Sequence, residues 1–308
     1  MVTVVGSFNM DLVIEAPRFP APGEAILGNN FRRACGGKGA NQALAIARMG
    51  SPVSMIGAVG QDAFGEEMLA GLNAAGVNTS GVVRRADVPS GTAMIVLDAT
   101  GQNQIVVANG ANDTLAAADI EQHADVIRGS RALVLQLETP LKGVTAAVDI
   151  ASLARVPVIL NPAPFAPVPE SLLQKCAFII PNEGEASRLT GCEVRDIQSA
   201  AAAARLLRAR APQADVLVTL GANGVWLDTP EFTGHVPGFS VNAVDTVGAG
   251  DTFIGAFVAE FVNGAAVRDA ARFGCASAAI AVTRRGAQSS IPVRSEVEDW
   301  LKHRPQDR

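Results

Sequence analysis

The chain has 308 residues, 48% of them apolar and 18% charged, which is enough for one large α/β domain or two small ones around a substantial core. Its formal net charge of −5 argues against nucleic-acid binding, which usually requires a basic stripe. The charge excludes little about small ligands, because local cations and helix ends can bind an anionic nucleotide.

Short β-branched runs alternate with longer alanine-rich segments along the chain. The expected strands, in chain order, are Val2–Val5, Val53–Val59, Ala132–Leu137, Val156–Leu160, Phe178–Ile180 and Val216–Leu220. The expected helices are Ala40–Met49, Gly65–Ala75, Leu141–Leu153, Ile197–Arg210, Ala249–Val262 and Ala266–Val282. Several strands are apolar without alternation, as in strands covered on both faces. The pattern predicts a doubly wound α/β fold, a mostly parallel sheet with helices on both faces, with a closed (β/α)8 barrel as the alternative.

Two stretches, residues 12–34 and 92–108, depart from this alternation because no helix separates their extended pieces. The second stretch has the pattern of a β-hairpin that turns at Thr100-Gly101. We expect the two stretches to form a small β-sheet lid that projects from the main sheet; an antiparallel edge on the main sheet is the alternative. The sequence shows no linker or repeat, so we predict one domain over residues 1–308 that carries this lid.

The strongest chemical signal is the segment DTVGAGDTF, which runs from Asp245 to Phe253. The apolar stripe that follows places its glycines, Gly248 and Gly250, at a helix N-terminus, where unpaired N–H groups and the positive dipole end suit a phosphate. The same field should keep Asp251 ionised, so that it accepts a hydroxyl proton while N–H groups hold phosphoryl oxygens. An ordinary helix cap is the alternative. The second acid and the paired glycines favour phosphoryl transfer from a nucleotide to a small alcohol.

A second signal is the glycine-rich run from Cys35 to Gln42. It is not a P-loop, because Lys38 is followed by Gly39 instead of Ser or Thr. No G-x-G-x-x-G fingerprint follows the first strand, which counts against a Rossmann dehydrogenase. What remains is a glycine bend that lets a ligand approach the backbone, with Lys38 and Asn41 as donors; a flexible hinge is the alternative.

Polar side chains follow several predicted strands, at the edge where open α/β sheets usually bind ligands. Asn9 and Asp11 follow the first strand and suit a polyol, and Glu138 follows the run that ends at Leu137. Further along the chain, the pair Asn182 and Glu185 suits water around Mg²⁺, and the segment Thr219–Gly224 suits a nucleotide. Each of these signals is weak alone, and their joint placement supports a ligand site.

The four cysteines are scattered, with no C-x-x-C pair and no histidine at ligand spacing, so we expect reduced thiols and no zinc site. The first residues lack the basic region and long apolar core of a signal peptide. No apolar run is long enough to span a bilayer. We therefore expect a cytoplasmic protein without a membrane partner.

Taken together, these residues resemble the PfkB family of carbohydrate kinases, from about Val4 to Pro292. Gly36–Asn41 resembles the N-terminal glycine signature of the family, Asp245–Asp251 its C-terminal signature and Asn182–Glu185 its Asn-x-x-Glu motif. Three motifs in this order are highly specific. The stretches Gly6–Asp11 and Thr283–Gln288 resemble in particular the members that act on ribose.

The resemblance implies ATP-dependent phosphorylation of D-ribose at its 5-hydroxyl, with Asp251 as the base. The implied sugar-binding residues are Asn9, Asp11, Gly37, Lys38, Asn41, Glu138 and Asp251, and the implied anion hole is Gly248, Ala249 and Gly250. Asn182 and Glu185 would organise Mg²⁺ and phosphates, and the implied nucleotide site also has Thr219, Gly221, Gly224, Gly250 and Cys275. A K⁺ site would comprise the side chains of Asp245 and Ser290 and the carbonyls of Val247, Ala281, Arg284 and Gly286.

The resemblance also implies a homodimer formed through the lid. The chain departs from the family pattern at Cys275, where many relatives carry Asn or His beside the adenine, so base selectivity is expected to be looser. Two alternatives stay open: a kinase for fructose, deoxyribose or a nucleoside, and a non-catalytic sugar or nucleotide sensor.

Overall fold

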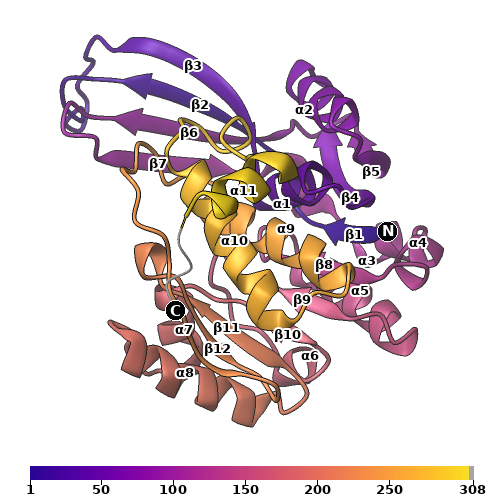
Figure 1. Ribbon diagram of the computed structural model, residues 1–308. Coiled ribbons are helices and arrows are strands. Elements are labelled where there is room, and N and C mark those ends of the chain that lie inside the picture. The colour runs from indigo at the N-terminus through magenta and orange to yellow at the C-terminus, as the bar shows by residue number, and fades with distance from the viewer. Residues whose placement is uncertain (305–308) are drawn as a thin grey trace.

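Nine strands form the main sheet of the computed structural model, which describes residues 1–304 (Figure 1). Their order across the sheet is β13 (Thr233–Val236), β12 (Val225–Asp228), β11 (Asp215–Thr219), β10 (Phe178–Ile179), β9 (Val158–Leu160), β8 (Ala132–Leu135), β1 (Val2–Val5), β4 (Val53–Gly60) and β5 (Asn78–Arg85). The strands from β11 to β5 pair in parallel, and β12 and β13 are antiparallel additions at one edge. The open, mostly parallel sheet confirms the predicted fold class, and the (β/α)8 barrel is wrong. The predicted domain extends to residue 308, so its last four residues lie outside the described ones.

Helices cover both faces of this sheet. One face is covered by α1 (Lys38–Arg48), α2 (Ala63–Ala74), α9 (Ala249–Val262) and α10 (Val267–Ala281). The other face is covered by η1 (Gly110–Thr114), α3 (Ala117–Glu121), α4 (Ala124–Arg128), α5 (Leu141–Leu153), α6 (Glu170–Leu173), α7 (Glu183–Thr190) and α8 (Ile197–Arg210). The remaining elements are η2 (Gly221–Asn223), which follows β11, and α11 (Arg294–Lys302), which packs on α10.

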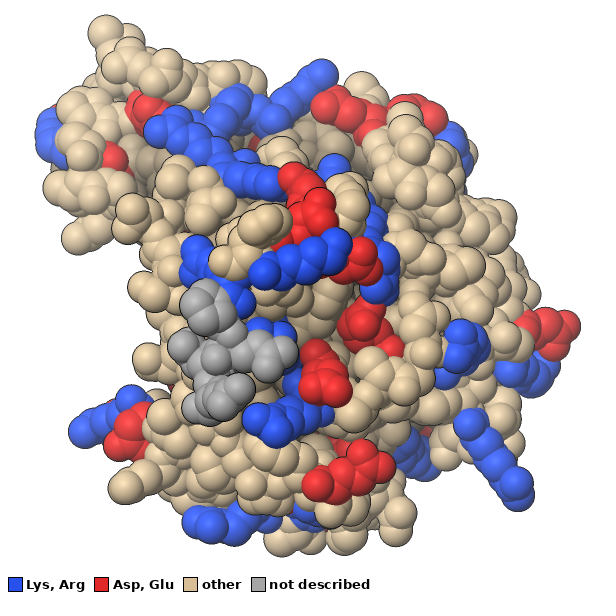
Figure 2. Space-filling view, in the orientation of Figure 1, with Lys and Arg blue, Asp and Glu red and all other residues tan. Residues whose placement is uncertain are grey.

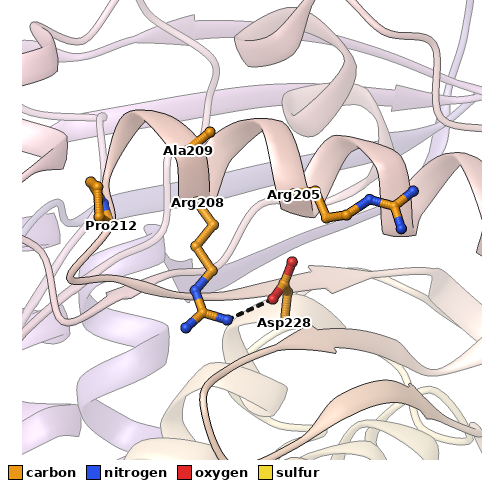
Figure 3. Close-up of a pocket in the computed structure, with 5 residues that line it drawn as sticks. All are labelled: Arg205, Arg208, Ala209, Pro212 and Asp228. Atoms are coloured by element: carbon orange, nitrogen blue, oxygen red, sulfur yellow. Dashed lines mark hydrogen bonds and ion pairs between the residues drawn. The ribbon is translucent and has the colours of Figure 1, made fainter.

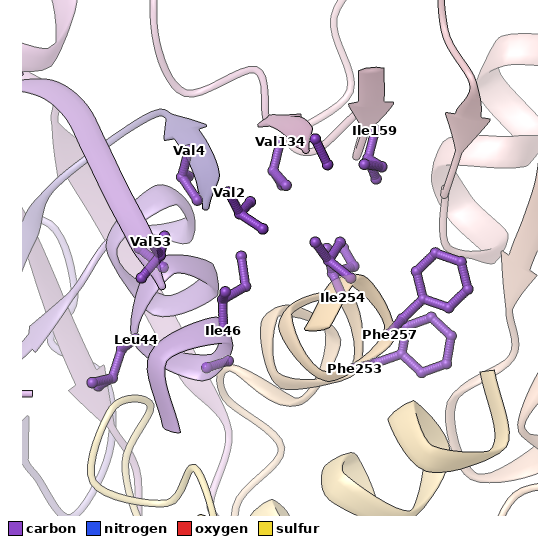
Figure 4. Close-up of a cluster of buried hydrophobic side chains, with 14 of the residues drawn as sticks. Val2, Val4, Leu44, Ile46, Val53, Val134, Ile159, Phe253, Ile254 and Phe257 are labelled. Atoms are coloured by element: carbon purple, nitrogen blue, oxygen red, sulfur yellow. The ribbon is translucent and has the colours of Figure 1, made fainter. Parts of the chain in front are cut away.

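The strand β1 shows why the predicted strands lack polar alternation. Val2 and Val4 point into a cluster with Ile254 and Phe257 of α9 (Figure 4), whereas Val5 packs on the opposite face with α5. Successive side chains of a strand point to opposite faces, and both faces are covered here. Every position of β1 is therefore buried, and the sequence is apolar throughout except for Thr3.

A second, four-stranded sheet stands apart from the main one (Figure 1), in the order β3 (Asn29–Gly36), β2 (Asn9–Glu15), β6 (Gly91–Leu97) and β7 (Asn103–Ala108). Its two outer pairs are antiparallel and the central pair, β2 with β6, is parallel. The predicted hairpin turn is confirmed: the Asp98 N–H donates to the Gln102 carbonyl at 2.9 Å, and Gly101 has a positive φ of 83°. The alternative of an added edge on the main sheet is wrong.

Positive and negative side chains are interspersed over the face shown in Figure 2. The four cysteines are unpaired thiols. Within residues 1–304, no helix is both long enough and apolar enough to cross a membrane.

Candidate active site

Several predicted site residues lie together at the N-termini of α1 and α9, because Asn41 donates to Asp251 and the Lys38 N–H donates to Glu138. Gly37 caps α1 with a φ of 91°, and a Cβ there would lie 2.7 Å from the Asn9 backbone nitrogen. Only glycine fits this bend, because other residues are strained at this φ and would collide with the neighbouring strand. The glycine-rich run therefore lets two backbone segments cross at close distance.

Asp251 lies in the first turn of α9, which begins after Gly248 in the left-handed conformation. Its side chain is buried, and its Oδ2 and Oδ1 accept hydrogen bonds of 2.9 Å from Asn41 Nδ2 and Gln42 Nε2. Burial raises the pKa of Asp251, while Lys38 and the two amides act in the opposite direction. The acid is thus held at both oxygens, more firmly than an exposed helix cap requires.

Lys38 joins the glycine run to the carboxylates of the site. Its backbone N–H donates to Glu138 Oε2 at 2.9 Å, so the segment that follows β8 is bound to the start of α1. Burial lowers the pKa of the Lys38 ammonium, but Asp251, Glu138 and Glu185 together raise it above its usual value. The cation therefore stays charged at the centre of an acidic pocket.

We call Asn9, Asp11 and Lys38 the polar cluster. Asp11 and Asn9, at the start of β2, form its other wall. A side chain at Gly36 would meet Asp11 Oδ2 at 2.7 Å, so the carboxylate lies directly over this glycine. Burial, followed by repulsion from Glu138, raises the pKa of Asp11 to about 7. The Asn9 oxygen accepts from Asn112 Nδ2 at 3.0 Å, and this fixes the direction of its amide.

A cleft of about 730 Å³ adjoins this cluster. Its lining includes most of the predicted nucleotide residues, namely Asn182, Thr219, Gly221, Gly224, Gly250 and Cys275, together with Ala249 of the predicted anion hole. Nothing lies within 4 Å of where a Gly250 side chain would start, so the helix end is open to a ligand. Burial raises the pKa of the Cys275 thiol to about 12, which makes it an apolar wall group instead of a reactive one.

Asn182 and Glu185 form the N-terminal capping box of α7. The Glu185 N–H donates to Asn182 Oδ1, and Glu185 Oε2 accepts from the Asn182 N–H, both at 2.9 Å. Glu185 is buried, and burial raises its pKa while the Asn182 N–H and Lys38 oppose that change. Helix α7 was not among the predicted helices, so this structural role of the pair was not predicted.

The residues predicted to bind K⁺ come from two adjacent loops. The N–H groups of Val244 and Asp245 donate to the Val282 carbonyl, which joins the loops. Asp245 Oδ1 accepts from the Val247 N–H at 3.0 Å, and Oδ2 accepts from the Gly286 N–H at 2.9 Å. The Ser290 hydroxyl donates to the Ala287 carbonyl. In the turn after α10, the Arg284 N–H donates to the Ala281 carbonyl.

Several polar residues of the site were not predicted. Gln42 had no predicted role beyond ending the glycine run, and Ser7, Asn112, Gln136 and Asn161 were not predicted to belong to the site. All five are buried polar residues. A buried polar side chain is informative because it must find a partner, but burial is not visible in the sequence at these positions.

A smaller hollow of about 300 Å³ lies between α8 and β12 (Figure 3). Arg208 Nη1 lies 2.7 Å from Asp228 Oδ1 there, while Arg205 points away along the helix. The ion pair joins α8 to the antiparallel edge of the sheet. None of the predicted site residues lines this hollow, so it is separate from the candidate active site.

Known proteins of one family resemble this chain in sequence and in fold. The family model described as pfkB family carbohydrate kinase matches residues 1–294. The chain therefore belongs to the PfkB family of carbohydrate kinases, which confirms the resemblance inferred from its motifs. Within this family it is similar to ribokinases: the ribokinase of Haemophilus influenzae is 43% identical over 302 residues, covering 98% of each chain.

Two further relatives show the range of this similarity. The structure of Arabidopsis thaliana ribokinase complexed with ribose and ATP superposes with a TM-score of 0.91 at 32% identity, covering 98% of this chain and 99% of that one. The deoxyribokinase of Salmonella typhi is 38% identical over 301 residues, covering 97% of this chain and 98% of its own.

Proposed function

We propose that this chain is a ribokinase, which transfers the γ-phosphoryl group of ATP to the 5-hydroxyl of D-ribose to give ribose 5-phosphate and ADP. The observation that carries the proposal is the position of Asp251. Asp251 accepts a hydrogen bond from Asn41, interacts with the charge of Lys38, and directly follows Gly250, which lines the 730 Å³ cleft. The similarity to ribokinases over nearly the whole chain supports the same activity.

The polar cluster has the donors and acceptors that a sugar needs. The Asn41 amide donates to Asp251, and within the described residues its Oδ1 is buried without a hydrogen-bond partner. A buried, unpaired acceptor costs free energy unless a ligand satisfies it. We infer that a sugar hydroxyl donates to this oxygen, and that Asp11 and Glu138 accept from other hydroxyls.

In the proposed step, Asp251 accepts the proton of the 5-hydroxyl as that oxygen attacks phosphorus. A raised pKa makes the carboxylate a better base, and Lys38 and the two amides keep it ionised. We infer that the N–H groups of Gly248 and Gly250 at the start of α9 donate to the phosphoryl oxygens. The Ala249 N–H, which was also predicted for the anion hole, donates to the Thr246 carbonyl at 3.3 Å and would have to exchange that partner for a phosphoryl oxygen. Phosphoryl transfer depends mainly on such positioning and charge stabilisation.

We propose that the nucleotide binds with Mg²⁺, organised by Asn182 and Glu185. The carboxylate of Glu185 is an oxygen ligand of the kind that Mg²⁺ or its water shell prefers, and Asn182 lines the cleft. When bound, Mg²⁺ neutralises phosphate charge. The chain's own contribution is to hold the pair rigidly in the capping box of α7.

We further propose that K⁺ activates the enzyme by binding between the loops that contain Asp245 and Gly286. The donor set is one carboxylate, the Ser290 hydroxyl and the carbonyls of Val247, Ala281, Arg284 and Gly286, and such oxygen groups suit a large monovalent cation. The two loops are already joined by backbone hydrogen bonds, and the first leads directly into α9. A cation there would stabilise the anion hole.

A coupled ADP-release assay across pentoses, hexoses and nucleosides, with K⁺ or Na⁺, tests this proposal. We expect ribose to give the highest kcat/KM, with stimulation by K⁺. A preference for deoxyribose, as the name of the Salmonella typhi relative suggests, would support the alternative kinase. A preference for fructose or for a nucleoside would likewise assign a different substrate to the enzyme. ATP and sugar binding without ADP release would indicate a sensor and contradict the proposal.

We propose that the four-stranded sheet is a lid on a single kinase domain and that it mediates a homodimer. Exposed apolar side chains gather on this sheet, namely Phe31 at 66% exposure, Met94 at 62%, Ile105 at 51%, Val106 at 71% and Val107 at 51%. Met94 and Val106 are directly paired and share one face of the sheet, whereas Ile105 and Val107 point to the other face. Exposed apolar side chains on a sheet face can mark an interaction surface. A monomer in light scattering at micromolar concentration would contradict the dimer, and small-angle scattering without compaction on adding ribose and nucleotide would contradict the lid.

We place the enzyme in the cytoplasm. Its four cysteines are unpaired, which fits a reducing compartment, and the proposed reaction consumes ATP. Expression as a fluorescent fusion tests this location.

A further inference from the structure

Behind Asp251 lies a buried chain of side-chain amides, of which the proposed chemistry uses only the hydrogen bond from Gln42. It consists of Gln42 on α1, Gln136 after β8 and Asn161 after β9, with exposures of 0%, 0% and 7%. Gln42 Nε2 donates to Asp251 Oδ1 at 2.9 Å and to Asn161 Oδ1 at 3.2 Å. Gln136 Nε2 donates to Gln42 Oε1. We call these three side chains the amide relay.

The relay is anchored on a backbone carbonyl. Asn161 Nδ2 donates to the carbonyl oxygen of Ile180 at 2.9 Å. Because a carbonyl can only accept, Asn161 must turn its NH₂ group toward Ile180 and its oxygen toward Gln42. Gln42 must then present its own NH₂ group, with one hydrogen for Asn161 and the other for Asp251.

This orientation cannot be reversed without loss. A flipped Gln42 amide would set its oxygen against the carboxylate of Asp251 and leave Asn161 Oδ1 without a donor. Both changes are costly inside a protein, where unsatisfied polar groups and facing acceptors are poorly screened. Through Asn161 and Gln42, the Ile180 carbonyl therefore determines that the NH₂ group of Gln42 faces Asp251.

We propose, on the basis of the proposed function, that Gln42, oriented by Asn161, is a positioning residue that fixes the direction and the ionised state of the Asp251 carboxylate. Gln42 acts through Asp251 and is not itself placed against sugar or nucleotide. Asn41 holds the second oxygen of the carboxylate. The two amides together leave the remaining lone pairs of Asp251 directed at the incoming hydroxyl.

The charged groups that face Asp251 are Lys38 on α1 and the carboxylates of Glu138 and Glu185. Lys38 favours the ionised acid, and the two carboxylates oppose it. A substitution of Gln42 by Met changes none of these charges and nearly preserves side-chain volume. Any shift in the titration of Asp251 in that variant therefore reports the lost amide.

The test compares Gln42→Met and Asn161→Leu with the wild-type protein and with Thr3→Val. Thr3 is a matched control, because its hydroxyl is fully buried and bonded to Ser130 Oγ in another part of the sheet. A hydrogen bond to a charged group is worth about 1.5–3 kcal/mol, which corresponds to about one to two pH units. We expect Gln42→Met to lower kcat about 10- to 100-fold, to leave the sugar KM within about threefold, and to raise the acid limb of the pH–rate profile by about one to two units.

Asn161→Leu should shift the acid limb in the same direction by less, because Gln42 remains and is then oriented only by the hydrogen bond from Gln136 Nε2. Thr3→Val should lower the melting temperature without moving the acid limb. A purely structural relay would give that same result for Gln42→Met, and this outcome would overturn the proposal.

A second measurement separates this proposal from the proposed function. Carbon-13 NMR of aspartate-labelled protein follows the Asp251 carboxyl directly, assigned by its loss in Asp251→Asn. Failure of the wild-type protein to phosphorylate any sugar would contradict the proposed function alone. An unchanged Asp251 titration midpoint in folded Gln42→Met would contradict the relay, whatever the activity.

Discussion

Replacement of Asp251 by Asn tests the base directly, because Asn has nearly the same size and shape but cannot accept the proton. A general base contributes about 10²–10⁴ to the rate. This range corresponds to about 3–5 kcal/mol of transition-state stabilisation. We expect kcat to fall by that factor, with little change in the KM for ATP, because the nucleotide cleft is lined by other residues.

The structure also predicts the effect of Asp251→Asn on stability. Asp251 accepts from two amide NH₂ groups, those of Asn41 and Gln42, and an Asn side chain offers only one acceptor oxygen. One buried donor would lose its partner, at a cost of about 1–3 kcal/mol. The substitution also removes a carboxylate whose pKa is raised by burial, so part of that cost is offset.

The assay is coupled ADP release at saturating ribose and ATP, with thermal unfolding measured on the same samples. Asp228→Asn is a matched control, because Asp228 is also buried but is paired with Arg208 on the outer side of the sheet. It should lower the melting temperature and leave kcat unchanged. Turnover of Asp251→Asn within tenfold of the wild-type rate would refute the assignment of the base.

Three further predictions concern the sugar pocket and the cation loops. Since the pKa of Asp11 is raised from 3.8 to about 7, the folded protein holds a proton there that the unfolded chain releases, and this contribution to stability is lost as pH rises from about 4 to 7. Asp11→Asn should therefore raise the melting temperature at pH 8 relative to the wild-type protein, yet increase the ribose KM; an unchanged melting temperature would contradict this account. Gly91→Ala would bring a methyl group to 2.3 Å from Asn9 Oδ1, so ribose KM should rise at least tenfold in steady-state kinetics, whereas Gly71→Ala, with nothing within 4 Å, should have wild-type kinetics. Asp245→Ala should abolish the preference for K⁺ over Na⁺ in the ADP-release assay, and a wild-type enzyme indifferent to the cation would remove the proposed site.

The parts of the fold that were predicted are those with a strong local pattern. The buried runs of β1 and β8 and the apolar stripe of α9 are visible within a few residues, because burial on both faces or on one stripe dictates composition. Two regions of the main sheet were missed. The edge strand β5 contains Asn78, Thr79, Ser80 and Gly81 and is partly exposed, so it has no apolar run, and β12 and β13 have only four residues each.

The candidate site residues that the sequence indicated lie in short motifs, and those that it did not indicate depend on distant contacts. Asp251 and Lys38 lie in recognisable glycine-rich segments. The bond from Gln42 to Asp251 spans 209 residues of sequence, and that from Asn112 to Asn9 spans 103. The first pair is set by how α1 packs on α9 and the second by how η1 lies beside β2, and a single sequence does not contain this information at any fixed spacing.

Two of the junctions between the four-stranded sheet and the rest of the chain lie among the residues that we propose to bind the sugar. Strand β2 starts at Asn9, and β3 ends at Gly36, one residue before the cap of α1. A rigid tilt of this sheet must be absorbed by backbone torsions at these junctions, which are also where the proposed sugar contacts begin. Binding of a sugar in the proposed pocket and tilting of the sheet would therefore change the same few backbone torsions. No additional segment is required to couple the two.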